Sequence, residues 1–113
     1  MEERRYTFEE YAEVGDRLAR IYIAGPISIF PYEKARKRFD KAQERLNSAG
    51  FYIVANPLSF CCRSWDYGRC MRACMNRLSK CDAIYIQKWW WISRGARLER
   101  RVAIACDLDI IYE

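Results

Sequence analysis

A carboxylate placed shortly after a helix start is the feature of this sequence best suited to chemistry. The seven residues from Ser93 to Glu99 read Ser-Arg-Gly-Ala-Arg-Leu-Glu. Ser93 is a typical N-cap, and Glu99 then lies in the second helical turn, too late to be the acid of a capping box, which stands three residues after the cap. Capping therefore does not account for Glu99, and a carboxylate in this place is a candidate nucleophile.

The expected helix also predicts what surrounds this carboxylate. At about 100° per residue, Leu98, Val102 and Ala105 form one stripe that we expect to face the core, with Glu99 at its edge beside small residues. The competing interpretation is a solvated helix glutamate that pairs with a nearby lysine or arginine. The sequence around Glu99 leaves both interpretations open.

Length and composition predict one compact domain. The chain has 113 residues, of which 51% are hydrophobic, enough to bury a core without disulfides. The net charge of +5 suits anionic ligands such as nucleotide phosphates, and because the basic residues are spread along the chain, nucleic acid is the least favoured partner. No apolar run approaches a membrane span and the first residues form no signal-peptide core, so we expect a cytoplasmic protein without a membrane partner.

The cysteines and the absence of histidine narrow the possible chemistry. There are six cysteines, no histidine and no pair of C-x-x-C motifs, so we expect reduced cysteines and neither a metal nor another cofactor. Without histidine, Ser-His and Cys-His nucleophile pairs are excluded. Proton transfer then falls to Asp, Glu, Tyr, Cys or Lys. The cysteines are Cys61, Cys62, Cys70, Cys74, Cys81 and Cys106.

Short apolar strands alternate with helical patterns along the chain. The expected strands are residues 21–24, 51–55, 83–87 and 109–112, and the expected helices are residues 32–49, 71–81 and 94–106. This alternation predicts an α/β fold with a doubly wound parallel sheet of about four strands, most simply in the order 2-1-3-4, and helices on both faces. Residues 1–19 are expected to be an N-terminal helical extension, with Thr7 and Glu10 as a capping box, and residues 20–113 the main domain.

The loops at the carboxyl ends of the expected strands are the predicted binding edge. Ligands of parallel sheets bind at this edge. It would bring together Gly25-Pro26, Asn56-Pro57 and the Trp89-Trp90-Trp91 loop that leads to Glu99.

A set of ordered motifs links these loops to a known family. The motifs are Ile21-Tyr22-Ile23-Ala24-Gly25-Pro26-Ile27-Ser28, Ala55-Asn56-Pro57, Cys81-Asp82-Ala83-Ile84-Tyr85, Trp90 and Ser93-x-Gly95-Ala96-x-x-Glu99. Together they resemble the nucleoside 2-deoxyribosyltransferase-like superfamily, in particular its small phage and bacterial members of unassigned function. The resemblance covers about residues 20–113.

The resemblance implies a flavodoxin-like fold that cleaves or transfers the N-glycosidic bond of a nucleoside or nucleotide. In that chemistry the glutamate matching Glu99 attacks the anomeric carbon and forms a covalent glycosyl-enzyme, as in retaining glycosidases. Proximity to a helix N-terminus would keep Glu99 ionised.

The resemblance also implies roles for the neighbouring motifs. Tyr22, Gly25 and Pro26 match the loop that approaches the sugar or base, Ser93 and Gly95 match a turn that presents N–H groups to a phosphate or hydroxyl, and Asn56 and Trp90 match the base side. Ordinary turn formation is the alternative for Gly25-Pro26 and Asn56-Pro57. Core or interface packing is the alternative for the tryptophans.

Two departures from the family bear on activity. Active relatives usually carry an aspartate where this chain has Cys74, so either Asp66 or a tyrosine assists the departing base, or the domain binds without turnover. Relatives are oligomers that contribute active-site groups from an asparagine-bearing tail, which is not found before Glu113; this favours hydrolysis or binding over base exchange. We still expect a homo-oligomer from the exposed aromatic loop.

Two functional hypotheses follow. The first is a nucleoside or nucleotide N-glycosidase or deoxyribosyltransferase relative, with Glu99 and Asp66 as catalytic residues and a small-molecule substrate. The alternative is a catalytically inactive nucleotide-binding module, such as a phage ligand sponge or regulator.

Overall fold

The computed structural model describes residues 3–113 as an α/β fold around one parallel sheet. The strands are β1 (Arg4–Thr7), β2 (Ile21–Ala24), β3 (Val54–Ala55), β4 (Ala83–Ile86) and β5 (Asp109–Tyr112). Their order in the sheet is β1-β5-β4-β2-β3, with every neighbouring pair parallel. The four strands expected from the sequence thus have the expected order, whereas the expected count of about four is wrong because β1 adds a fifth strand.

The N-terminal segment is therefore more than a helical extension. Arg4 pairs with Asp109 and Thr7 with Tyr112, so β1 extends the sheet beyond β5. The predicted capping box is confirmed at the start of α1 (Phe8–Val14), where the Thr7 and Glu10 side chains each accept a hydrogen bond from the other residue's backbone N–H. A four-residue edge strand with two arginines carries too little apolar pattern to be recognised in the sequence. Residues 1–2 of the expected extension lie outside the described residues.

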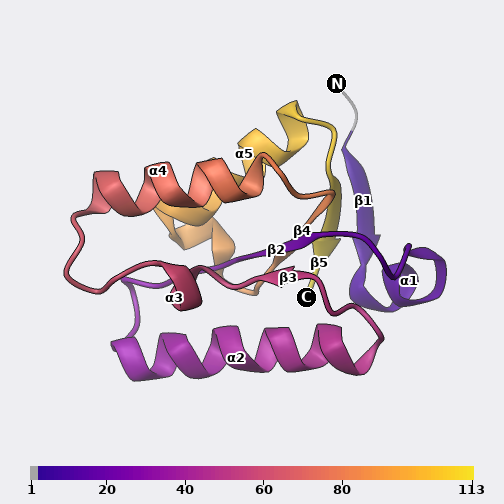
Figure 1. The fold of residues 1–113 in the computed structure, drawn as a ribbon, viewed down its shortest axis with the longest axis horizontal. Helices are drawn as coiled ribbons and strands as arrows, with labels where there is room; N and C mark the ends of the chain where they lie inside the picture. Colours follow the sequence, from indigo (N-terminus) through magenta and orange to yellow (C-terminus); the bar gives the residue numbers. More distant parts are fainter. Residues whose placement is uncertain (1–2) are drawn as a thin grey trace.

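Helices cover both faces of the sheet, as expected. Helix α2 (Tyr32–Ser48) lies on one face, and α4 (Tyr67–Leu78) and α5 (Arg94–Ala105) lie on the other (Figure 1). Short helices α3 (Pro57–Phe60) and η1 (Trp90–Ile92) follow β3 and β4. Helix α2 stops at the expected place, because Gly50 has a φ of 97°, a left-handed conformation that glycine adopts without strain. No helix in residues 3–113 is long and apolar enough to cross a membrane.

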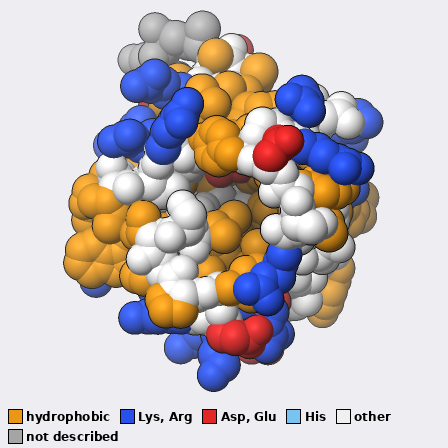
Figure 2. Space-filling view, turned by 90° about the vertical axis from the view of Figure 1, so that its left-hand side faces the viewer, with side chains coloured by type: hydrophobic (Ala, Val, Ile, Leu, Met, Phe, Trp, Pro, Cys, Tyr) orange, Lys and Arg blue, Asp and Glu red, His pale blue; other side chains and the backbone are white. Residues whose placement is uncertain are grey.

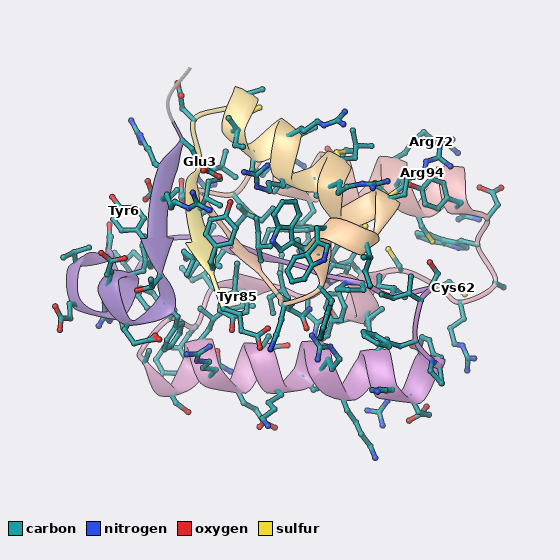
Figure 3. All side chains as sticks on the ribbon, turned by 180° about the vertical axis from the view of Figure 1, so that it is seen from behind. Glu3, Tyr6, Cys62, Arg72, Tyr85 and Arg94 are labelled. Carbon is teal, nitrogen blue, oxygen red and sulfur yellow. The ribbon has the colours of Figure 1, made fainter. Side chains whose placement is uncertain are left out.

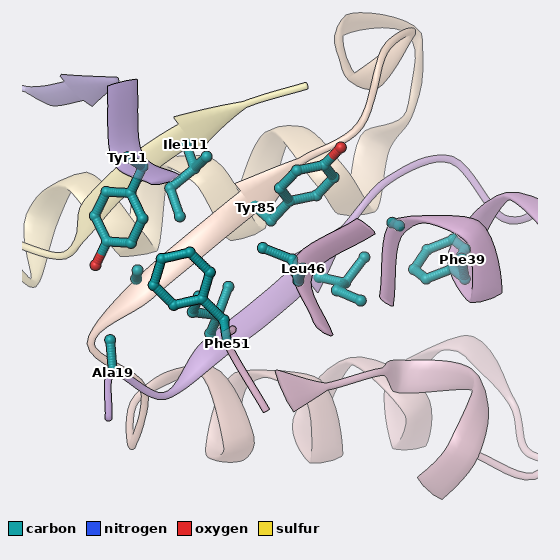
Figure 4. Packing of buried hydrophobic residues seen from close by; sticks show 11 residues of the cluster. Tyr11, Ala19, Phe39, Leu46, Phe51, Tyr85 and Ile111 are labelled. Carbon is teal, nitrogen blue, oxygen red and sulfur yellow. The ribbon is translucent and has the colours of Figure 1, made fainter. Parts of the chain in front are cut away.

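Side chains alternate between the two faces of the central strands and give two separate cores. On the α2 face, Leu46, Phe51, Tyr85 and Ile111 belong to one cluster (Figure 4). On the α4 and α5 face, the cluster includes Tyr22. Because successive residues of a strand point to opposite faces, the side chains of Tyr22 and Tyr85 can pack on opposite faces of the sheet, in different clusters.

The buried face of α5 differs from the expected one. Its buried residues are Ala96, Glu99 and Ala103, whereas Leu98, expected to face the core, is 41% exposed. Small side chains let the helix lie close to the sheet, so the stripe of small residues rather than the most apolar stripe is buried. Glu99 therefore lies inside the protein and is not a solvated helix glutamate.

Candidate functional site

A cavity of about 340 Å³ lies where the loop after β2, helix α4 and the start of α5 meet. This is the carboxyl end of the strands, the predicted binding edge. Figure 2 looks onto this end of the molecule and shows a hollow bordered by hydrophobic and uncharged atoms, with one basic side chain at its lower rim and others farther out. The residues that line this cavity, called the Glu99 cavity below, include Gly25, Ile27, Tyr32, Cys61, Arg63, Tyr67, Cys70, Met71, Cys74, Ser93, Gly95, Ala96 and Glu99.

Glu99 lines this cavity and is hydrogen-bonded to Tyr22, which does not line it. Glu99 is only 6% exposed and Tyr22 is fully buried, and the Tyr22 hydroxyl donates a hydrogen bond to Glu99 Oε2. Burial raises the pKa of Glu99 from 4.5 to about 8, although the Tyr22 hydrogen bond acts in the opposite direction. Desolvation thus opposes the ionisation of Glu99 that proximity to the helix N-terminus is expected to favour.

The start of α5 gives Glu99 its position. The Ser93 side chain accepts a hydrogen bond from the Ala96 N–H at 3.2 Å, so the predicted N-cap is confirmed. A Cβ on Gly95 would lie 3.5 Å from Met71 Sδ and 3.9 Å from the Tyr67 hydroxyl. Both are ordinary van der Waals distances, so α5 lies beside α4 at the cavity with room for a methyl group at Gly95.

Thiols form the wall next to the carboxylate. Cys74 is buried, and its Sγ lies 3.7 Å from Cys61 Sγ. Burial raises the pKa of Cys74 to about 12, despite a lowering contribution from Tyr22. All six cysteines are free. At neutral pH this wall is uncharged and behaves as an apolar surface.

Arginines and aromatic rings pair at the rim. The Arg63 guanidinium lies 3.9 Å from the centre of the Tyr32 ring, and that of Arg94 lies 5.0 Å from the centre of the Tyr67 ring. Figure 3 shows Arg94 and Cys62 at the same end of the molecule, far from Glu3 and Tyr6. An arginine at the mouth of an uncharged cavity suits a ligand that carries one anionic group.

The structure brings together five of the nine site residues predicted from the sequence. Gly25, Ser93, Gly95 and Glu99 line the cavity, and Tyr22 contacts Glu99. Pro26 is buried in the loop after β2 but does not line it.

The other three predicted residues have local structural roles and lie outside the lining of this cavity. Asn56 caps α3 by accepting a hydrogen bond from the Leu58 N–H and also bonds Gln43. Asp66 caps α4 by accepting from the Arg69 N–H at 2.7 Å. The Arg100 guanidinium lies over Trp90, 4.6 Å from the centre of the Trp90 ring.

Sequence reasoning did not assign the contribution of α4 to the cavity. Tyr67, Cys70, Met71 and Cys74 all line the cavity from this helix. Their spacing of three and four residues is the signal that could have identified them as one helix face. The sequence predicted this helix only from residue 71, so Tyr67 and Cys70 lay outside the expected element.

Comparisons with known proteins give a family but no activity. A search of curated proteins and a search of solved structures each found no significant match. The model of one protein family matches residues 19–112, which include β2 to β5 and every residue of the Glu99 cavity. That family is described as a domain of unknown function, DUF4406. This chain therefore belongs to the DUF4406 family.

Proposed function

We propose that this protein is a nucleoside or nucleotide N-glycosidase related to the 2-deoxyribosyltransferases, with Glu99 as the nucleophile. The observation that carries the proposal is the buried pair of Glu99 and Tyr22 at a cavity lined mostly by apolar side chains. A buried carboxyl held by one hydrogen bond costs stability, so its presence beside a cavity indicates chemistry there. The resemblance in sequence motifs supplies the reaction class.

The reaction has two steps. The ionised Glu99 oxygen bonds to the anomeric carbon while the bond from that carbon to the base nitrogen breaks, and the electron pair leaves with the base. Water then attacks the anomeric carbon, the bond from that carbon to the Glu99 oxygen breaks, and one water proton passes to the solvent; this releases the free sugar and restores the carboxylate. The Tyr22 hydroxyl orients the carboxylate throughout, because its raised pKa, caused by burial and by the Glu99 charge, keeps it protonated.

The cavity offers few groups that could protonate the departing base. Glu99 is the only acid among the described residues that line it, and Cys74 is a weak acid in its buried place. Tyr67, whose side chain lines the cavity and is 49% exposed, is the best placed proton donor. We therefore expect the fastest cleavage for bases that already carry a positive charge, such as nicotinamide, since these depart neutral without a proton.

A second candidate function is binding without turnover, as a nucleotide sponge or regulator. The specific observation in its favour is the uncharged thiol wall at Cys61 and Cys74 in place of a second carboxylate. This candidate predicts retention of an intact nucleoside or nucleotide by the same cavity.

The test is chromatographic detection of free base. Purified protein is incubated with nucleosides, their 5′-monophosphates and nicotinamide adenine dinucleotide, with Glu99→Gln in parallel. We expect base release by the wild type and a loss of at least about a thousandfold in the variant, because the amide is a poor nucleophile. Glu44→Gln, which changes an exposed glutamate of α2 in the same way, is the matched control.

The outcomes separate the two candidates. Base release that survives Glu99→Gln would contradict the proposed nucleophile. No release from any substrate, together with a ligand-dependent rise in melting temperature that Glu99→Gln weakens, would favour the binding module.

We also propose a homo-oligomer. Trp89, Trp91 and Ile92 are 41%, 47% and 51% exposed beside one another in and after the loop that follows β4, an apolar surface that suits a second copy. Sedimentation of the wild type should show a dimer or larger species, and Trp91→Ser should shift it toward the monomer.

A further inference from the structure

A second cavity, of about 350 Å³, lies on the opposite face of the sheet from Glu99. Its lining comes from helix α2 and from the ends of β4 and β5. Tyr85 lines it and belongs to the hydrophobic cluster on the α2 face, whereas Tyr22 belongs to the other cluster. The sheet therefore separates this cavity, called the arginine cavity below, from the Glu99 cavity.

Three basic side chains of α2 line the arginine cavity: Arg38, Lys41 and Arg45. Their spacing of three and four residues places them on one helix face. The only acid among the described residues of the lining is Glu113, whose Oε1 already accepts a hydrogen bond from the Lys88 N–H at 2.9 Å. The cavity thus carries a surplus of positive charge.

The two arginines are held in place by the protein. Arg45 donates to the Tyr85 hydroxyl at 3.0 Å and to Glu9 at 3.4 Å. Arg38 donates through one terminal nitrogen to the Lys88 carbonyl at 3.1 Å. Lys41 is exposed and forms no ion pair with an acid in residues 3–113. Two fixed guanidinium groups and one free ammonium group therefore surround the space.

Two buried donors in the lining have no partner. Arg38 Nε and Gln87 Nε2 are buried nitrogen atoms without a hydrogen-bond partner, and Gln87 is only 1% exposed. Buried polar atoms are nearly always satisfied, and an unmade hydrogen bond is costly. Both missing partners must be acceptors, because a guanidinium nitrogen and a side-chain amide nitrogen can only donate.

From this arrangement we infer that the arginine cavity is a second ligand site, which binds the phosphate group of a small phosphorylated molecule. Three basic side chains outnumber the two nearby acids, Glu113 in the lining and Glu9 paired with Arg45, and together with two unused N–H donors they match a phosphate with several acceptor oxygens. The cavity is larger than a phosphate needs, so the rest of the molecule occupies the remaining space. This inference is independent of any reaction at Glu99.

The experiment is a calorimetric titration of the full chain with inorganic phosphate in chloride buffer at constant ionic strength. Wild type, Lys41→Gln and Lys37→Gln are compared. Lys37 is an exposed lysine of the same helix that does not line the cavity, so Lys37→Gln removes the same charge outside the site. We expect Lys41→Gln to weaken phosphate binding about tenfold and Lys37→Gln to leave it within about twofold of the wild type.

Further variants separate this site from the Glu99 cavity. Gln87→Leu, which removes one unpartnered donor, should also weaken phosphate binding, whereas Glu99→Gln and Arg63→Gln should not. Equal weakening by Lys41→Gln and Lys37→Gln, or loss of binding in Arg63→Gln alone, would overturn the inference. So would the absence of binding to inorganic phosphate at millimolar concentration.

The choice of ligand distinguishes the sources of the phosphate. Inorganic phosphate, a nucleoside 5′-monophosphate and a sugar phosphate are titrated separately, with acetate as the monoanionic comparison. Tighter binding of either phosphate ester than of inorganic phosphate, sensitive to Lys41→Gln, supports the inference and names the molecule. Binding of a nucleic-acid duplex alone, with a steep salt dependence, would overturn it in favour of a nucleic-acid surface.

Discussion

The two cavities of this protein are nearly equal in size and opposite in chemistry. The Glu99 cavity measures about 340 Å³ and has one buried acid among apolar side chains, whereas the arginine cavity measures about 350 Å³ and has three basic side chains. Both lie near the carboxyl ends of the central strands. Because side chains alternate along a strand, Tyr22 of β2 contacts Glu99 of one cavity and Tyr85 of β4 lines the other. The carboxyl ends of the strands thus lie near two cavities that share none of the described lining residues.

Burial acts differently on carboxyl groups and on guanidinium groups. Burial raises the pKa of Glu99 to about 8, so the carboxyl is mostly neutral at pH 7. Arginine stays charged at any physiological pH. Apart from Arg63 at its rim, the Glu99 cavity therefore presents a nearly uncharged surface that suits a base and a sugar, whereas the arginine cavity remains positive and suits an anion.

The largest expected effect is a dependence of stability on pH that comes from Glu99 alone. In the unfolded chain Glu99 has its ordinary pKa of 4.5, and in the folded protein it has a pKa of about 8. The folded protein then binds the proton more tightly, so this stabilisation is fully present below pH 4.5 and is lost as pH rises through about 8. The loss is on the order of 5 kcal/mol at its full extent. Urea unfolding of wild type and Glu99→Gln between pH 5 and 9 measures it.

The control for this prediction is the arginine cavity. Lys41→Gln should leave the pH dependence of the unfolding free energy unchanged, because no acid lies within ion-pair distance of Lys41 in residues 3–113. If wild type and Glu99→Gln lose stability in parallel from pH 5 to 9, the carboxyl is ionised when folded and the contrast between the cavities is wrong.

Gly25 lies between a residue of the arginine cavity, Gln87, and the Glu99 cavity, and its replacement should disturb both. Gly25 lines the Glu99 cavity, and a Cβ there would lie 2.5 Å from Nε2 and 2.8 Å from Cδ of Gln87, which lines the arginine cavity. Gly25→Ala should therefore cost about 1–3 kcal/mol in the free energy of unfolding, since the buried Gln87 must move. Thermal or urea unfolding measures this cost.

A second substitution shows whether the contact with Gln87 is the cause. The double variant Gly25→Ala with Gln87→Ala removes the side chain that the new methyl group meets. It should be less destabilised than the sum of the two single variants. Simple additivity would show that the contact with Gln87 does not cause the destabilisation.

The sequence predicts most of the fold, because apolar runs mark the central strands and helix caps mark the helix starts. The run Asp109–Tyr112 and the Ser93 cap are found as expected. The fifth strand was missed because Arg4–Thr7 becomes a strand only by pairing with β5, a tertiary interaction that leaves little local signal.

The site was harder to predict for two physical reasons. Glu99 was identified correctly as unusual, but its burial depends on which face of α5 meets the sheet, and the apolar stripe at Leu98 favoured the wrong face. The arginine cavity could not be foreseen, because Gln87 and the basic side chains of α2 carry no motif. They become a site only when α2 lies across the ends of β4 and β5.

Tyr22→Phe tests whether the hydrogen bond from Tyr22 lowers the pKa of Glu99, and its expected cost in stability is smaller than those above. The variant keeps the buried ring and removes only the hydroxyl that donates to Glu99. Because that hydrogen bond lowers the pKa of Glu99, its loss should raise this pKa further and shift the rising limb of the pH profile of kcat/KM for base release to higher pH. The lost hydrogen bond should cost about 1 kcal/mol of stability. An unchanged pH profile would show that Tyr22 does not act on the ionisation of Glu99.

The smallest expected effect concerns Asp66, which the sequence placed among the catalytic residues. Asp66 is exposed, lies outside the lining of the Glu99 cavity and caps α4 through the Arg69 N–H. Asp66→Ala should cost about 1 kcal/mol by removing the cap, whereas Asp66→Asn keeps a capping oxygen and should cost only a few tenths. If Asp66 only caps the helix, Asp66→Asn should retain base release.

A large loss of base release in Asp66→Asn, with the melting temperature unchanged, would show instead that Asp66 protonates the departing base. The Glu99 cavity would then contain two working acids in the bound state, and the contrast between an almost neutral cavity and a charged one would hold only for the ligand-free protein.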